Sequence, residues 1–157
     1  MTKAVLALGS NLGDRGATVV EAVRQLALVD GIEVVAASDL VETVALTPTG
    51  PDPSAPGYLN GVVIIDSSLS PEELLDAANA VEADLGRVRG EQRWVDRTID
   101  IDLVDVDGVT RSTEHLTLPH PRAAERSFVL GPWLSIDPDA RLNGVRISEL
   151  LARLEGS

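Results

Sequence analysis

Arg97-Thr98-Ile99-Asp100-Ile101-Asp102-Leu103 alternates apolar and acidic residues with a period of two. Successive side chains of a β-strand point to opposite faces, so this alternation predicts a strand over Ile99 to Val106. The two isoleucines and the leucine then face a core, while Asp100 and Asp102 share the other face. The segment therefore predicts a strand that carries an acidic pair beside a buried surface.

The acidic pair is a candidate metal site. Neighbouring carboxylates repel each other unless a cation lies between them, and their hard oxygen atoms suit Mg²⁺. The alternative, that Asp100 and Asp102 are only exposed acids on the wet face of an edge strand, stays open at this point. Further along the strand, Asp105 and Asp107 fall on the opposite face, where we expect solvated charges at the strand end.

A cationic run precedes the acidic pair in a protein whose formal net charge is −12. Carboxylate-held Mg²⁺ together with a guanidinium clamp is the recurring arrangement of phosphoryl-transfer sites. A solvated charged loop is the alternative interpretation. The run consists of Arg87, Arg89, Arg93 and Arg97.

Apolar periodicity around this segment predicts the other elements. Strands are expected at Ala4 to Leu8, Ile32 to Ser38 and Tyr58 to Asp66. Helices are expected from Ala17 to Ala27, from the capping box Ser70-Pro71-Glu72-Glu73 to a stop at Gly86, and along the tail where Ile147, Leu150, Leu151 and Leu154 share a face. The proline-rich segment from Leu46 to Gly57 is expected to be an irregular loop.

The order of these elements is β-α-β followed by β-α-β. We therefore predict an α+β fold, a ferredoxin-like sandwich with a mainly antiparallel sheet and helices packed on it. The length of 157 residues fits one domain, which we expect to span residues 1–157.

Composition argues against several functional classes. The net charge of −12 disfavours a general nucleic-acid binder, and the chain contains no cysteine for disulfides or thiolate metal sites. No apolar run approaches a membrane span of roughly 18 residues, and the N-terminus lacks a signal pattern. We expect a cytoplasmic enzyme without a membrane or nucleic-acid partner.

Several motifs, in this order, make the chain resemble the 6-hydroxymethyl-7,8-dihydropterin pyrophosphokinases of the folate pathway. The motifs are Gly9-Ser10-Asn11-Leu12, Tyr58-Leu59-Asn60, Gly86-Arg87-Val88-Arg89, Arg93-Trp94, Arg97-Thr98-Ile99-Asp100-Ile101-Asp102 and Leu118-Pro119-His120-Pro121. The resemblance implies a ferredoxin-like fold, two Mg²⁺ ions, and transfer of the diphosphate of ATP to the hydroxymethyl group of the pterin with release of AMP. We also expect a monomer.

The resemblance further implies roles for individual residues. Asp100 and Asp102 would bind both metal ions, and Arg87 and Arg97 would clamp the triphosphate. The remaining nucleotide contacts would come from Asn79, Glu82, Trp94, Leu103, His115, Thr117, His120 and Arg126. The pterin would be held by Asn60, by stacking between Tyr58 and Phe128, and by the backbone of Thr43 and Leu46. Trp133 has no implied site role, and we expect it in the core.

The chain departs from the family pattern in the loops. Val41, Val44 and Pro121 replace residues common in the family, Val95-Asp96 stands in place of a Gly-Pro pair, and the Leu46 to Gly57 connection is longer. These departures leave open a paralogue that binds pterin or nucleotide without transferring diphosphate. An acidic domain that contacts only other proteins is a further alternative.

Overall fold

In the computed structural model of the chain, the described residues are 2–10, 15–43, 45–47, 50–52, 58–88, 99–107, 109–114 and 116–155. The main sheet contains β1 (Thr2–Ser10), β2 (Ile32–Ala37), β6 (Tyr58–Ser67) and β7 (Asp100–Val106) in the order β2-β6-β1-β7, and β3 (Val41–Thr43) also pairs with β6. Every pairing in this sheet is antiparallel. Two helices, α1 (Arg15–Ala27) and α2 (Pro71–Val88), connect β1 to β2 and β6 to β7, which confirms the ferredoxin-like prediction.

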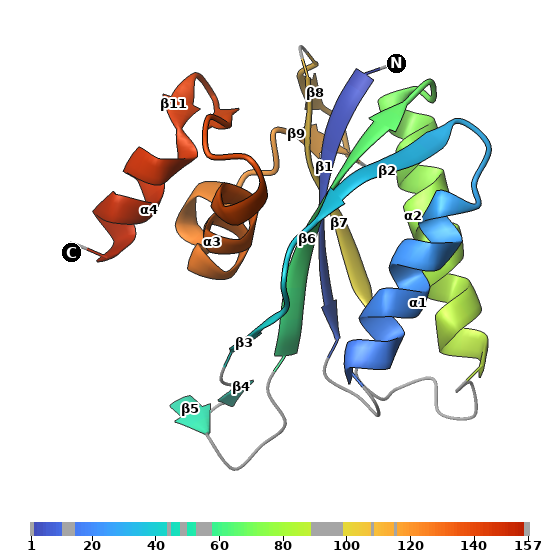
Figure 1. Ribbon diagram of the computed structural model, residues 1–157, viewed down its shortest axis with the longest axis horizontal. Coiled ribbons are helices and arrows are strands. Elements are labelled where there is room, and N and C mark those ends of the chain that lie inside the picture. Colours follow the sequence, from blue (N-terminus) through green and yellow to red (C-terminus); the bar gives the residue numbers. More distant parts are fainter. Residues whose placement is uncertain are drawn as a thin grey trace.

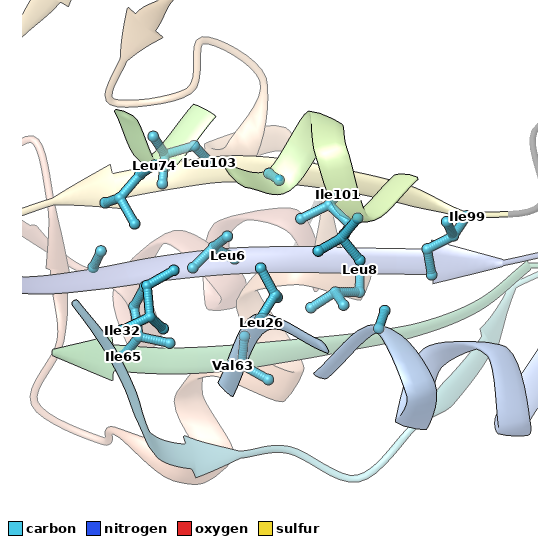
Figure 2. Packing of buried hydrophobic residues seen from close by; sticks show 14 of the residues in the cluster. Leu6, Leu8, Leu26, Ile32, Val63, Ile65, Leu74, Ile99, Ile101 and Leu103 are labelled. Carbon is cyan, nitrogen blue, oxygen red and sulfur yellow. The ribbon is translucent and has the colours of Figure 1, made fainter. Parts of the chain in front are cut away.

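Helices α1 and α2 cover one face of the sheet (Figure 1). The side chains of Ile99, Ile101 and Leu103 are buried in this core, as the alternation of the sequence predicts. Figure 2 shows them beside Leu6 and Leu8 of the central strand. Full burial of each such side chain contributes about 1.5–3 kcal/mol, so this core positions β7 firmly.

The capping box at the start of α2 forms as predicted. The backbone N–H of Glu73 donates to Ser70 Oγ over 3.1 Å, and the N–H of Ser70 donates to Glu73 Oε1 over 3.0 Å. The other end of the helix differs from the prediction. Helix α2 continues through Gly86 to Val88, because a glycine can terminate a helix but does not oblige it to end.

Helix α3 (Ser127–Ile136) lies on the opposite face of the sheet, and α4 (Ile147–Glu155) packs against α3, as Figure 1 shows. Trp133 is only 2 % exposed in this second core, which confirms its expected packing role. A 3₁₀ turn, Ala123–Glu125, precedes α3, and the hairpin of β10 (Arg141–Leu142) and β11 (Val145–Arg146) leads into α4. The predicted tail helix is confirmed, whereas α3 was not predicted.

Two further hairpins lie outside the main sheet. The segment expected to be an irregular loop contains β4 (Ala45–Thr47) and β5 (Gly50–Asp52), which pair with each other, so that prediction was wrong. Proline is tolerated there because a two-stranded ribbon leaves half of its N–H groups unpaired. The second hairpin, β8 (Arg111–Ser112) with β9 (Thr117–Leu118), follows β7.

A bulge in β7 changes the orientation of its last residues. Leu6 of β1 pairs with Leu103, but Val5 pairs with Asp105, so Val104 is an extra residue. Asp105 therefore lies on the same face as Asp100 and Asp102, which corrects the expectation that it lies on the other. Asp105 is also half-buried rather than fully solvated. Together with Asp107 it lines a cavity of about 320 Å³ whose wall includes Lys3, Trp133 and Arg141.

Candidate functional site

The predicted metal residues lie on the outer strand of the main sheet. Asp100 and Asp102 are half-buried on β7, with side chains on the face opposite Ile99 and Ile101. Within the described ranges, no group of three or more His, Cys, Asp or Glu residues could hold a metal ion. A pair of carboxylates nevertheless suits Mg²⁺, which takes one or two protein carboxylates and completes its shell with water and phosphate oxygens.

A cavity of about 310 Å³ opens at the edge of β7, beside Asp102. Five of the residues predicted to contact the nucleotide line it, although they come from three separate parts of the chain: Asn79, Glu82, Leu103, Thr117 and His120. Asn79 and Glu82 belong to α2, and Thr117 and His120 to the segment after β8. The fold thus brings one predicted set of residues together around one hollow.

Five other residues of the cavity wall were not predicted: Leu75, Ile101, Glu114, Leu116 and Pro121. Leu75 could have been found, because it precedes Asn79 by four residues and Glu82 by seven, which places all three on one face of α2. Glu114 and Leu116 gave no such signal. They belong to a turn between β8 and β9, whose position depends on contacts with the rest of the fold.

His120 is held at the edge of β7 by its backbone. Its N–H donates to the carbonyl oxygen of Val104 over 2.8 Å, and its ring Nδ1 accepts the backbone N–H of Arg122 over 3.2 Å. Burial lowers the pKa of His120 below its ordinary value, the negative Asp102 opposes this shift, and Arg126 and Arg122 add to it. With Nδ1 accepting, the neutral ring presents its Nε2–H as a donor.

Arg126 links the acidic strand to α3. One of its guanidinium nitrogen atoms lies 3.6 Å from Asp102 Oδ2, and the guanidinium carbon lies 5.8 Å from the ring centre of Phe128. The second geometry is that of a cation–π contact. Arg126 therefore stands between a predicted metal residue and a predicted pterin residue, at the point where α3 begins.

Asn60 is 6 % exposed on β6, and its side-chain nitrogen donates to the carbonyl oxygen of Val41 over 3.4 Å. Thr43 pairs with Tyr58 in the sheet, and Leu46 pairs with Pro51 in the β4–β5 hairpin. Phe128 is half-buried at the start of α3 and packs against the second core. Figure 1 places β3, which carries Thr43, at one end of the main sheet.

Several predictions fall outside the described residues. Trp94, Arg97 and His115 lie there, as do the side chains of Thr43, Leu46, Tyr58 and Arg87, whose backbones are described. Arg87 belongs to the last turn of α2. The roles predicted for these seven residues stay predictions.

A known protein family matches most of the chain. Residues 5–138 match the family described as 7,8-dihydro-6-hydroxymethylpterin-pyrophosphokinase. A curated relative from Methylorubrum extorquens, named 2-amino-4-hydroxy-6-hydroxymethyldihydropteridine pyrophosphokinase, is 45 % identical over 157 residues, covering 100 % of this chain and 96 % of its own. A relative of the same name from Mycobacterium bovis is 40 % identical over 171 residues, covering 99 % of this chain and 85 % of its own.

Solved structures share the fold at low sequence identity. A crystal structure of a Plasmodium falciparum HPPK-DHPS triple mutant superposes with a TM-score of 0.72 at 15 % identity, covering 97 % of this chain and 43 % of that one. A structure described as HPPK-DHPS in complex with substrates gives a TM-score of 0.72 at 13 % identity, covering 98 % and 45 %. This chain therefore spans less than half the length of either structural neighbour, and the likeness concerns the fold alone.

Proposed function

The chain belongs to the 7,8-dihydro-6-hydroxymethylpterin-pyrophosphokinase family, and from that premise we propose how the residues around β7 carry out the reaction. The protein is an ATP-dependent transferase of folate biosynthesis. It moves the diphosphate of ATP onto the hydroxymethyl group of 6-hydroxymethyl-7,8-dihydropterin. The hydroxymethyl oxygen forms a bond to the β-phosphorus, the bond from that phosphorus to the α,β-bridging oxygen breaks, AMP leaves with the electron pair, and the hydroxyl proton passes to solvent.

The cavity at the edge of β7 is the proposed adenosine site. Its volume of about 310 Å³ is at the lower end of ligand pockets, which suits a nucleoside with its phosphates outside. Leucine and isoleucine side chains of the wall supply apolar surface for the base, and Asn79 and Thr117 supply hydrogen-bonding groups. Asp102 and His120 also line the cavity, and we place the phosphates of the nucleotide beside them.

Asp100 and Asp102 are the proposed Mg²⁺ ligands. Two carboxylates on one face of a strand fit the ion's preference for oxygen atoms with room left for phosphate and water. When bound, Mg²⁺ would supply charge neutralisation to the diphosphate being transferred. That two ions bind is part of the proposal and is supported by the family pattern, in which both acids serve two ions.

The positive charge of Arg126 supports a role in binding phosphate beside Asp100 and Asp102. Its position 3.6 Å from Asp102 puts a guanidinium within reach of phosphate oxygens that approach the acidic pair. His120 adds an uncharged donor at the cavity wall. The proposed catalysis is thus charge neutralisation and positioning, with no covalent enzyme intermediate. Arg87 and Arg97 remain the proposed clamp of the triphosphate.

Asn60 and Phe128 are the proposed pterin residues, together with Tyr58, Thr43 and Leu46. The amide of Asn60 can both donate to and accept from the edge of a pterin, and the ring of Phe128 offers a stacking surface. The observation that carries the proposal is the register of the sheet. Asn60 and Asp100 both pair with Gly9, one on each side of β1. The proposed pterin residue and the proposed metal ligand are therefore about two strand spacings, or about 10 Å, apart.

Phosphorus NMR of a mixture of ATP, Mg²⁺ and the hydroxymethyl dihydropterin tests the reaction. Stoichiometric AMP and a pterin diphosphate are expected, and formation of ADP would exclude diphosphate transfer. Binding of both substrates without AMP would instead favour the non-catalytic paralogue. Asp100→Asn and Asp102→Asn should each remove most of the turnover, whereas Asp107→Asn, at an exposed position just after β7, should not.

Three wider proposals accompany this function. We place residues 1–157 in a single pyrophosphokinase domain that acts as a monomer in the cytoplasm, where ATP is available. Size-exclusion chromatography with light scattering tests the oligomeric state. Across the described ranges, no helix is both long and apolar enough to cross a membrane.

A further inference from the structure

The wall of the adenosine cavity depends on a short segment with little regular structure. Glu114, Leu116, Thr117, His120 and Pro121 all line the cavity, yet β9 contributes only two residues to this part of the chain. Strands β8 and β9 form just two residue pairs, Arg111 with Leu118 and Ser112 with Thr117. A two-stranded ribbon of this length is marginal by itself, so other contacts must fix its position.

Thr113 makes three hydrogen bonds to one residue of that wall. Its backbone N–H donates to the carbonyl oxygen of Leu116 over 2.9 Å, and its hydroxyl donates to the same oxygen over 3.1 Å. The N–H of Leu116 in turn donates to Thr113 Oγ1 over 3.0 Å. The hydroxyl therefore acts as donor and acceptor at once, and it satisfies both backbone groups of Leu116.

Leu116 is the point at which this turn joins the main core. It is 7 % exposed and packs in the same cluster as Ile101 and Leu103, which also line the cavity. Thr113 itself is exposed. A buried N–H that loses its acceptor is costly, so loss of the hydroxyl would favour a shift of Leu116, and with it Thr117, relative to β7. The far end of the segment is already fixed, because the N–H of His120 donates to Val104.

We propose that Thr113 is a positioning residue for the nucleotide, acting through the hydrogen bonds of its hydroxyl to Leu116. This inference rests on the proposed function, because it takes the cavity to be the adenosine site. Thr113 touches no part of the transferred group in this scheme. It holds one wall of the cavity at the distance from α2 and β7 that the base requires.

The exposed ion pair of Arg111 with Glu72 provides a matched control. It joins the same hairpin to α2 over 2.8 Å, but both partners are solvent-exposed, and such pairs contribute little. If every contact of this hairpin contributed equally to nucleotide binding, Arg111→Gln would weaken the affinity for Mg-ATP as much as loss of the Thr113 hydroxyl. If the hydroxyl is the specific brace, Arg111→Gln should leave the affinity for Mg-ATP within about twofold of the wild type.

The test compares Thr113→Val, which keeps the shape and removes the hydroxyl, with Thr113→Ser, which keeps the hydroxyl. Thr113→Val should raise the Kd and KM for Mg-ATP about fivefold to tenfold, with kcat and the KM for pterin nearly unchanged. Thr113→Ser should restore both nucleotide constants. Thr113→Ala is a second variant without the hydroxyl in case valine perturbs the turn.

Hydrogen exchange at the Leu116 amide gives a reading that needs no ligand. It should be faster in Thr113→Val than in the wild type or in Thr113→Ser. Unchanged exchange, an unchanged KM for Mg-ATP, or a loss confined to kcat would each overturn the inference. Wild-type protein that binds Mg-ATP but releases no AMP would count against the proposed function and leave the Thr113 comparison readable by calorimetry.

Discussion

Asn60 of β6 and Asp100 of β7 lie on opposite sides of one residue, Gly9, in the central strand of the sheet. Gly9 occupies the position between them where any other residue would place a side chain on their shared face. The alternation along β1 supports this, because Val5 and Ala7 face the second core while Leu6 and Leu8 face the first. The row of three residues thus has a small centre between two polar ends.

Gly9→Val should reduce turnover by about 100-fold, because a branched side chain would stand between the proposed positions of the pterin and the diphosphate and shift the two apart. Gly9 is buried, so overpacking should also cost about 1–3 kcal/mol of stability. Steady-state kinetics and urea unfolding separate the two effects, and calorimetry should still detect Mg-ATP. Gly9→Ala should lie between the wild type and Gly9→Val. A folded Gly9→Val with normal turnover would contradict the prediction.

The ring of His120 should titrate below its ordinary pKa of 6.5. Because burial lowers this pKa and Asp102 raises it, Asp102→Asn should lower the midpoint further, whereas Arg126→Gln should raise it. Proton NMR of the ring, with His115→Gln for assignment, measures all three values. The unfolded chain takes up this proton first as the pH falls, so the stability contribution is present above about pH 6.5 and declines below it. A midpoint above 6.5 would refute the prediction.

Asp105→Asn should stabilise the protein at neutral pH. Burial and the nearby charge of Asp107 raise the pKa of Asp105 above its ordinary value of 3.8, so its ionised form is disfavoured in the folded state. The wild type therefore loses stability as the pH rises from 3.8 through the raised pKa of folded Asp105. The gain from Asp105→Asn should vanish near pH 3.8, where the carboxyl of the folded wild type is protonated. Thermal unfolding at several pH values tests this, with the exposed Asp84→Asn as control. An equal effect at pH 4 and pH 7 would argue against it.

Gly131 and Gly144 form a matched pair for backbone conformation. A Cβ would meet nothing within 4 Å at either position, but Gly144 has a φ of +80° and Gly131 lies inside α3. Gly131→Ala should raise the free energy of unfolding by about 0.5–1 kcal/mol, since alanine loses less entropy in a helix. Gly144→Ala should lower it by about 1–2 kcal/mol because of left-handed strain. Denaturant unfolding of both variants measures the two changes in the free energy of unfolding, and a change of the opposite sign in either variant would contradict the prediction.

Local patterns in the sequence predicted the parts of this protein that depend on near neighbours. Alternation placed Ile99, Ile101 and Leu103 in the core, and the capping box of Ser70 and Glu73 began α2 where expected. Helix α3 was missed, because Gly131 and Pro132 are poor helix formers and the burial of Leu130 and Trp133 outweighs their preference.

The candidate site divides in the same way. Asp100 and Asp102 were apparent as a pair, and the family resemblance supplied five further residues of the cavity wall. Glu114 and the brace of Leu116 by Thr113 gave no signal in the sequence, because the position of a turn depends on what the turn packs against. The roles of the residues in the arginine-rich segment stay predictions.

The sequence by itself determined the strand that carries the acidic pair, since the direction of each side chain follows from the pleat of the backbone. Tertiary structure decided where the alternation of side chains along this strand ends. The extra residue Val104 exists only relative to the register with β1, and it turns Asp105 to the face of Asp100. Tertiary structure likewise decided that Asn60 and Asp100 lie on either side of Gly9, because pairing between strands distant in sequence is set by the packing of the whole sheet.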